Sequence, residues 1–510
     1  MLDHAVHSRI PTPGTPLERQ NALAVALQQD PGIKHGSRRA WHMYFIVLCA
    51  CLCSTDNGFD GTVMGGINSM HQYQSYFGMT GAGLGTSLVF GIYTVGSLTG
   101  TIPASILPDR YGRRLSMLAG NLILIIGALI TGTATFRSTF IFGRFLTGVG
   151  GACAAAAAQS YLAEMAPAHD RGLYLGILNS FATGMMVSTG KYENDWSWRL
   201  PLFVQLIPAL FNAIFIFSCP ESPRWLYANG RRIEARQVLA KLHSSTGDLY
   251  SPLVDLEMEE IEDKVTVDDE GDEASQPLLN SGNSARRSSR SSKRFWDFGS
   301  LFADTPGTRY RTWMVILIGV FGQLSGNGMV TYFLPNLLVI AGITNQNTKL
   351  ILNFVNSITS FLGALSGSAL VDRIGRRSIL IWSTAGPARG SAGIAFIYIF
   401  MVVFGWTPMQ SLYPSEVLPY QNRVKGLAFS NVIAQGSSCV NTFGLPLALE
   451  LLDWRVILIF VFWDTFEAII LYLFMVETKG LSLEEIDEVF SHSDPRHCST
   501  EIGRSTDAGT

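Results

Sequence analysis

The sequence has few charged residues for its length of 510, and this shortage limits the class of protein that it encodes. Asp, Glu, Lys and Arg make up 15% of the residues, whereas soluble proteins average about 25%. Several windows of about 20 residues carry no charge, and that length spans roughly 30 Å of hydrocarbon. The mean hydropathy is +0.24. The composition therefore excludes an ordinary soluble domain and predicts an all-α protein that crosses the membrane many times.

Patterns of residues that carry out chemistry are also scarce. The seven cysteines lie mostly inside apolar stretches and lack the paired spacing of a metal site. The glycines near Gly148 and Gly151 follow no strand and precede no phosphate-binding lysine, which excludes a nucleotide loop. No nucleophile–base motif stands in a soluble segment. We therefore predict no enzyme activity, no cofactor, no metal and no nucleic-acid partner.

Long apolar stretches take up much of the chain and are separated mostly by short polar turns. A long polar segment, about 225–311, divides six of them from the rest. The candidate spans lie near 42–66, 85–107, 115–135, 140–162, 172–190, 199–219, 312–340, 349–371, 391–414, 426–450 and 454–475.

Basic residues are concentrated in one alternate set of loops. "DRYGRR" (109–114), the long polar segment, "DRIGRR" (372–377) and "NRVKG" (422–426) are rich in Lys and Arg, and the other loops are poor in them. Because loops rich in Lys and Arg stay on the cytoplasmic side, both termini are expected to be cytoplasmic.

The second half of the sequence repeats the first. "DRYGRR" returns as "DRIGRR", "YLAEMAP" as "YPSEVLP", and "PESPRWL" has a looser echo in "VETKGLSL". Two similar halves in the same orientation are typical of transporters made of two bundles, with the binding site between them. The predicted divisions are an N-terminal tail (1–40), a six-helix bundle (41–220), a cytoplasmic link (221–311) with a disordered insert about 266–293, a second bundle (312–478) and a C-terminal tail (479–510).

The ninth span is too short in this repeat. Asp109 and Glu164 are 55 positions apart, but Asp372 and Glu416 only 44. "SILIWSTAGPA", about 378–388, remains for the ninth helix, or roughly 16 Å at 1.5 Å per residue. It is either a half-helix sheltered by its neighbours or the trace of a segment lost at a misread splice junction. The second alternative is favoured because irregular backbone exposed to lipid is costly.

Several motifs in a fixed order resemble the sugar porters of the major facilitator superfamily, most closely fungal hexose and disaccharide (lactose-permease-like) transporters. The resemblance covers about residues 42–490 and implies twelve helices and alternating access for a monosaccharide, disaccharide or polyol. The motifs are "GFDGTVMGGIN", "PDRYGRR", "GRFLTGVGG", "YLAEMAP…RG", "WSWRLP", "PESPRWL", "GQLSGNG…Y", "DRIGRR", "LYPSEVLP…RVKG" and "VETKG".

The resemblance implies a proton switch made by Asp60 and Arg144. Proton-coupled sugar porters have an Asp in the "GFDG" position and an Arg in the "GRFLTGVGG" position. A carboxylate inside the membrane indicates function, because its charge is costly unless it is paired or protonated. A fixed structural ion pair is the alternative. Asp56, one turn earlier, matches no family position and is expected to have no role in coupling.

The resemblance also implies a charged network that closes the cytoplasmic side. Simple anchoring of the loops by their positive charge is the alternative role for these groups. Its members are Asp109, Arg113, Arg114, Glu164, Arg171, Glu221, Arg224, Asp372, Arg376, Arg377, Glu416 and Arg423.

The predicted sugar site consists of amide side chains and one aromatic residue. It departs from the family at Gly322 and Gly328, where relatives carry a Gln and an Asn. Each amide alone serves equally well as a contact between helices. The candidates are Asn179, Gln323, Asn327, Tyr332, Asn353, Asn356, Gln410, Gln435 and Asn441.

Two further features lie outside these sets. Trp196 and Trp198 are expected in the aromatic belt at the membrane interface. Ser289 in "ARRSSRSSKR" resembles the target of a basophilic protein kinase, although these arginines could equally lie against anionic lipid.

The leading hypothesis is a sugar–proton symporter in the plasma membrane, with a small-molecule sugar, protons and the lipid bilayer as partners. The alternatives are an uncoupled facilitator, a sugar sensor, or a chain that is inactive because its ninth helix is short.

Overall fold

The structure is a computed structural model, and it describes most of the predicted helices. The main described segments are 36–54, 56–79, 83–165, 194–244, 247–259, 306–340, 342–385, 423–452 and 455–479, with shorter pieces near 25, 30, 261–262, 302, 404–418 and 486–499. Every regular element in these segments is a helix, as the all-α prediction requires.

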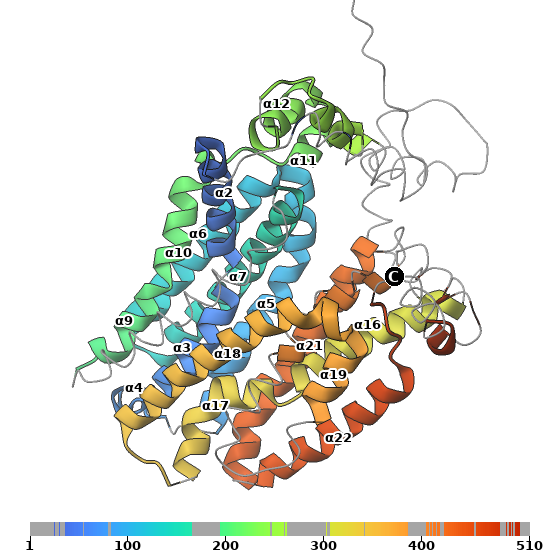
Figure 1. The fold of residues 1–510 in the computed structure, drawn as a ribbon. Coiled ribbons are helices and arrows are strands. Elements are labelled where there is room, and N and C mark those ends of the chain that lie inside the picture. The colour runs from blue at the N-terminus through green and yellow to red at the C-terminus, as the bar shows by residue number, and fades with distance from the viewer. Residues whose placement is uncertain are drawn as a thin grey trace, which may run out of the picture.

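The first half contains five of the predicted spans (Figure 1). The first span is a pair of helices, α2 and α3, and the sixth is the pair α9 and α10. The bounds are α2 Arg38–Ser54, α3 Asp56–Asn68, α4 His71–Phe77, α5 Leu84–Tyr111, α6 Arg113–Thr133, α7 Arg137–Met165, α9 Trp196–Val204 and α10 Leu206–Phe215. The predicted span 172–190 lies outside the described residues.

Two short helices of the link, α11 (Pro223–Ala228) and α12 (Arg232–Leu242), lie at one end of the first half (Figure 1). We call this end of the molecule the link face and the opposite end the far face. The second half follows as α16 Pro306–Leu324, α17 Asn327–Ile340, α18 Gln346–Ile374, α19 Arg376–Ala385, α21 Arg423–Leu452 and α22 Val456–Phe474.

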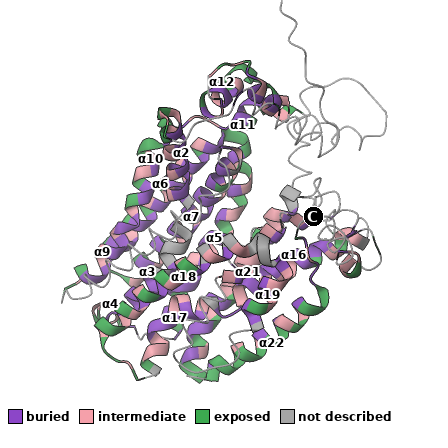
Figure 2. Cartoon of the chain, viewed as in Figure 1, coloured by how far each residue is buried: buried purple, intermediate pink, exposed green. Residues whose placement is uncertain are grey.

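Six helices are long and apolar enough to cross a membrane, among the residues that are described. Their outward faces carry large exposed apolar side chains, such as Ile214 of α10 and Phe462 of α22. Figure 2 shows exposed residues along α10 and α22, on the outside of the two bundles. In water such faces would be unfavourable, whereas in a bilayer they contact lipid.

The sharp turn between neighbouring spans depends on the same glycine in each half. Gly112 of "DRYGRR" has φ +92° and Gly375 of "DRIGRR" has φ +100°. Residues with a Cβ adopt such angles at a cost, so glycine is favoured there. The repeat seen in the sequence is therefore a repeat of backbone geometry.

Apolar packing joins the two halves at the far face. One buried cluster there contains residues of both halves, including Ile67 of α3, Phe90 of α5 and Phe333 of α17. Two other clusters, one containing Tyr161 and one containing Tyr413, each belong to a single half. A fourth holds the link helices together. Among the described cores, only the one at the far face connects the halves.

The ninth helix is described from Arg376 to Ala385. Residues 386–403 lie outside the described part of the chain, so the prediction of a short ninth helix stays a prediction. The predicted disordered insert about 266–293, including Ser289, also lies outside the described residues.

Candidate functional site

A charged cluster with a buried arginine–glutamate pair lies at the link face of the first half. Arg113 Nη2 is 2.9 Å from Glu164 Oε1 and 3.1 Å from Asp109 Oδ1. Ser222 Oγ donates to the other oxygen of Glu164. Glu221 accepts from the backbone N–H of Arg113 at 3.0 Å, at the first turn of α6. A carboxylate there compensates unpaired N–H groups and the positive end of the helix dipole.

The second half repeats the arginine–glutamate pair of this cluster together with its hydroxyl and helix-capping partners. Arg376 Nη2 is 2.9 Å from Glu416 Oε1, and Thr478 Oγ1 donates to Glu416 Oε2 at 2.6 Å. Glu477 accepts from the backbone N–H groups of Arg376 at 2.8 Å and Arg377 at 3.1 Å, at the start of α19. Glu477 was not among the predicted members of the network. The echo of "PESPRWL" in "VETKGLSL" was the signal that could have identified it.

The described bonds of each charged cluster stay within its own half. The guanidinium of Arg114 donates to Phe217 O at 3.0 Å, and that of Arg377 to Tyr472 O at 2.8 Å. No described ion pair joins the two clusters. Arg224 is exposed. Arg171 and the side chains of Asp372 and Arg423, all three predicted members of the network, lie outside the described residues.

Close backbone contacts also join the two halves at the far face. The N–H of Gly83 donates to Pro446 O at 3.2 Å, and Ser87 Oγ donates to Phe443 O. A Cβ placed on Gly65 would lie 2.9 Å from the carbonyl oxygen of Tyr332. The two helices meet backbone to backbone, which only glycine permits.

Further polar contacts hold the loops of the far face. Gln346, at the start of α18, accepts from the backbone N–H of His71 at 3.2 Å, and its amide donates to Gln72 at 3.3 Å. Both bonds join the first half to the second. Together with the apolar cluster they close this end of the molecule.

Two predicted site residues, Gln435 and Asn441, lie on α21. Residues 433–439 of this helix are all partly exposed. Farther along the same helix, Asn441 and Thr442 are buried. Gln435 is therefore accessible in this arrangement and Asn441 is not.

Three of the predicted amides form one connected group. Gln323 Nε2 lies 3.4 Å from Gln410 Oε1, and Asn441 Nδ2 donates to Gln323 O at 3.0 Å. The glycines that replace polar residues of the family contribute space to this group. The side chain of Gln410 lies against Gly322, and that of Asn441 against Gly328.

Tyr332 connects the amide group to the first helix. Its ring lies against Gly328 on one side, and a Cβ on Gly61 of α3 would overlap it. Gly61 directly follows Asp60 in the sequence. The backbone beside the predicted proton-binding residue is therefore in contact with the aromatic residue beside the amides.

Two further candidates lie on the buried face of α18. Asn353 is 1% exposed, and neither polar atom of its side chain has a hydrogen-bond partner among the described residues. The Oδ1 atom of Asn356 also has no hydrogen-bond partner among them. Leu350, one turn before Asn353, packs in the far-face cluster. Asn179 and the side chain of Asn327 lie outside the described residues.

Arg144 is buried in the first half, at 2% exposure. Its guanidinium carbon lies 4.8 Å from the centre of the Tyr93 ring, and its Nε donates to Val89 O at 3.5 Å. The side chains of Asp56 and Asp60 lie outside the described residues, although α3 packs against α7, which carries Arg144. The Asp60–Arg144 pair therefore stays a prediction.

The prediction that Trp198 lies in the aromatic belt at the membrane interface is wrong. Its side chain is fully buried among Tyr73, Phe77 and Phe140, with ring centres 5.5–6.2 Å apart. Only Trp196 is exposed, as a residue of the interfacial belt would be. Neighbouring tryptophans on a helix face different sides, and the packing of α4 against α9 decides which of them is covered.

The model of one protein family, described as "Sugar (and other) transporter", matches residues 46–490. The chain belongs to this family. The transporter is therefore an integral membrane protein and no enzyme, as predicted. Its relatives include High-affinity glucose transporter 1 of Candida albicans, 24% identical over 505 residues that cover 90% of this chain and 87% of the relative. Polyol transporter 5 of Arabidopsis thaliana is 28% identical over 441 residues that cover 79% of this chain and 78% of the relative.

Solved structures support the fold. The transporter resembles the major facilitator superfamily proton:xylose symporter XylE bound to 6-bromo-6-deoxy-D-glucose, with a TM-score of 0.66, 20% identity and coverage of 89% of this chain and 100% of that one. The inward open conformation of the xylose transporter XylE from E. coli gives a TM-score of 0.65 at 19% identity and covers 88% of this chain and 99% of that one. The transporter thus has the two-bundle fold of the major facilitator superfamily, as predicted.

Proposed function

We propose that this transporter moves a monosaccharide, disaccharide or polyol across the membrane together with a proton, by alternating access. The observation that carries the proposal is the group of amides formed by Gln323, Gln410 and Asn441, with Tyr332 beside it. Amide groups both donate and accept hydrogen bonds, as do the hydroxyl groups of a sugar. The glucose and polyol transporters among its relatives support the same substrate class.

Within this proposal the unpartnered amides on α18 belong to the same site. Asn353 and Asn356 have buried polar atoms that make no hydrogen bond to the described residues, which is unfavourable unless another group, a ligand or water supplies one. Gln435, which is partly exposed on α21, is assigned to contact the sugar as it enters or leaves.

Proton coupling is assigned to Asp60 and Arg144. When the two pair, the arginine favours the ionised carboxylate, and when they separate, burial favours the protonated form. The contact of Gly61 with Tyr332 supports coupling to the sugar, because α3 cannot move at Asp60 without displacing the aromatic ring. Uncoupled facilitation is the alternative within the same fold.

Switching between states is assigned to the two ends of the molecule. The far face is closed by apolar and backbone contacts between the halves, and the described ion pairs of each charged cluster at the link face stay within its own half. With the link, which is rich in Lys and Arg, on the cytoplasmic side, this arrangement is open to the cytoplasm. In the opposite state the clusters around Glu164 and Glu416 approach each other and the far-face contacts separate.

The same orientation places both termini in the cytoplasm, and we assign the transporter to the plasma membrane. The link then presents Ser289 to cytoplasmic protein kinases.

A panel of labelled sugars and polyols, taken up by cells lacking their own carriers, tests the substrate class. Uphill accumulation should require a proton gradient and should be lost in Asp60→Asn, which should still exchange sugar across the membrane. The exposed acid Glu450, as Glu450→Gln, is the control and should accumulate sugar normally. Accumulation by Asp60→Asn equal to the wild type would reject coupling, and absence of uptake of every sugar and polyol by the wild type would reject the substrate class.

A further inference from the structure

The last helix of the second half carries two carboxylic acids on its buried face. Asp464 and Glu467 of α22 lie on the same stripe as Val456 and Leu471, and they are 6% and 0% exposed. The helix is otherwise strongly apolar and is among those long enough to cross the membrane. An acid inside the membrane is costly when ionised and is rarely kept without a function.

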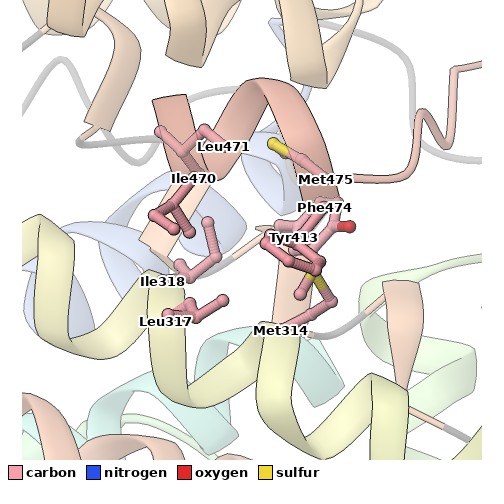
Figure 3. Close-up of a pocket in the computed structure, with 8 residues that line it drawn as sticks. All are labelled: Met314, Leu317, Ile318, Tyr413, Ile470, Leu471, Phe474 and Met475. Atoms are coloured by element: carbon pink, nitrogen blue, oxygen red, sulfur yellow. The ribbon is translucent and has the colours of Figure 1, made fainter. Parts of the chain in front are cut away.

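Glu467 has an apolar environment. Neither of its carboxylate oxygens has a hydrogen-bond partner among the described residues. Trp463 stands one turn earlier, its indole N–H lies near the Glu467 carboxyl group, and its ring packs against Phe321 of α16 at 6.2 Å. One turn later, Leu471 lines an apolar pocket with Ile318 of α16 (Figure 3). Among the described residues on these sides, no positively charged group compensates a negative charge.

The described charged and titratable groups of the elements packed against α22 lie mostly near the link face, and Glu450 of α21 lies against Gly83 at the far face. Asp464 is the charged neighbour closest to Glu467, and it has the same sign. Five such groups bind near the link face. Arg376 of α19 pairs with Glu416, and the other four donate to backbone oxygens. These four bonds are Arg311 to Ile486 O, Arg377 to Tyr472 O, Tyr310 to Phe474 O and Tyr413 to Val476 O.

The first half shows what occupies the equivalent place there. Asn212 of α10 stands five residues before Phe217, and Glu467 stands five before Tyr472, whose backbone oxygens accept from the equivalent arginines Arg114 and Arg377. Asn212 is fully buried, accepts from Asn121 at 2.7 Å and donates to Cys49 O at 2.8 Å. The first half therefore has a permanently neutral, hydrogen-bonded amide where the second has a carboxyl group.

The matching position on the ninth helix does not provide a partner of that kind. Thr384 corresponds to Asn121, because each follows its arginine, Arg376 or Arg113, by eight positions. Thr384 Oγ1 donates to Leu380 O at 2.8 Å and accepts from Trp406 Nε1 at 3.2 Å. Its hydroxyl hydrogen is thus already used.

We propose that Glu467 is a proton-binding site of the second half, protonated in the arrangement described here and separate from Asp60 and Arg144. The ligand is a proton because the described residues contain no third Asp, Glu, His or Cys beside the two acids, so the oxygen set of a metal ion is missing. A protonated carboxyl group is neutral, like the amide of Asn212, and unlike the amide it can release its proton. The two bundles then differ in one respect: only the second carries a titratable group at this position.

Infrared spectroscopy of the purified full-length transporter in lipid nanodiscs tests this proposal, because protonated and ionised carboxyl groups absorb at different frequencies. At neutral pH the wild type should show the band of a protonated carboxyl group, slow to exchange in deuterated buffer because Glu467 is fully buried. Glu467→Gln should lose this band, and its amide preserves the size of the side chain. Glu450→Gln, which removes an exposed acid of α21, should retain it.

Glu467→Asp provides a second test should the amide variant fail to fold, since it keeps an acid and should shift the band instead of removing it. An unchanged band in both variants, or its loss only in Asp464→Asn, would overturn the proposal. The result does not depend on the proposed sugar–proton coupling. Asp60→Asn should abolish uphill accumulation and keep the slowly exchanging band, so failure of one proposal can be told from failure of the other.

Discussion

Replacing Gly65 by Ala should shift the transporter away from the state closed at the far face. A Cβ at this position would lie 2.9 Å from Tyr332 O and 3.0 Å from Thr331 O. Both atoms are backbone of α17, so no change of rotamer can relieve the contact. The two halves must move apart at the far face or the helices must distort.

The size of the effect follows from the cost of overpacking. One extra methyl group in a packed interface costs roughly 1–3 kcal/mol, and each 1.4 kcal/mol changes an equilibrium about tenfold. The ratio of open to closed far face should therefore rise by about 5- to 150-fold. The gain in helix propensity of Ala over Gly, roughly 1 kcal/mol, cancels because α3 is helical in both states.

Spin labels at Ser75 and Asn347 measure this ratio. Both residues are exposed at the far face, one on each half. The variant should show a larger share of long distances between the labels and a lower rate of uptake. Gly436→Ala is the matched control, since its Cβ would meet no atom within 4 Å. If Gly65→Ala gave the same distance distribution as this control, the assignment of the far-face closure to the contact of α3 with α17 would be refuted.

Three further predictions concern other parts of the molecule. Glu416→Gln should weaken the partly buried pair with Arg376 by roughly 2 kcal/mol, which changes the ratio of the two transport states about thirtyfold. Uptake kinetics should then show a changed maximal rate with little change in KM. Asn441→Ala should raise KM for sugar about tenfold by removing a hydrogen-bond donor, while a circular-dichroism melt should stay near that of the wild type. Burial alone lowers the pKa of His243, but the hydrogen bond and charge of Glu257, 2.7 Å away, raise it above its usual 6.5. The His243–Glu257 pair should therefore stabilise the docked link fully below about pH 6.5, and this contribution should be lost as the pH rises through the raised pKa of His243. Hydrogen exchange of α12 measures it. Exchange in Glu257→Gln should differ from the wild type at low pH and become equal to it at high pH.

The sequence alone determined the class of protein and the position of its helices. Because a bilayer requires about 20 apolar residues for each crossing, local hydropathy suffices to locate the spans. The repeat of "DRYGRR" and "YLAE" predicted that Arg113 and Arg376 occupy equivalent places, and each pairs with the glutamate expected, Glu164 and Glu416. These features depend on short segments and on the repeat between halves.

The polar groups inside the bundles were only partly predictable. Gln323, Gln410 and Asn441 were expected at the site and lie together. Asp464 and Glu467 were not singled out, although the rule applied to Asp60 covers any acid inside a span. Whether such an acid faces lipid, a partner or the bundle core depends on how the helix is rotated, and neighbouring helices decide that.

Only the tertiary structure decided which surfaces meet. The contact of Gly65 with the backbone of Tyr332, the burial of Trp198 and the capping of α19 by Glu477 join residues far apart in the chain. Hydropathy reports whether a residue avoids water, and it contains no information about which apolar face packs against which. That choice depends on the shapes of all the helices at once, which is why the closed far face could not be foreseen from the sequence of either half.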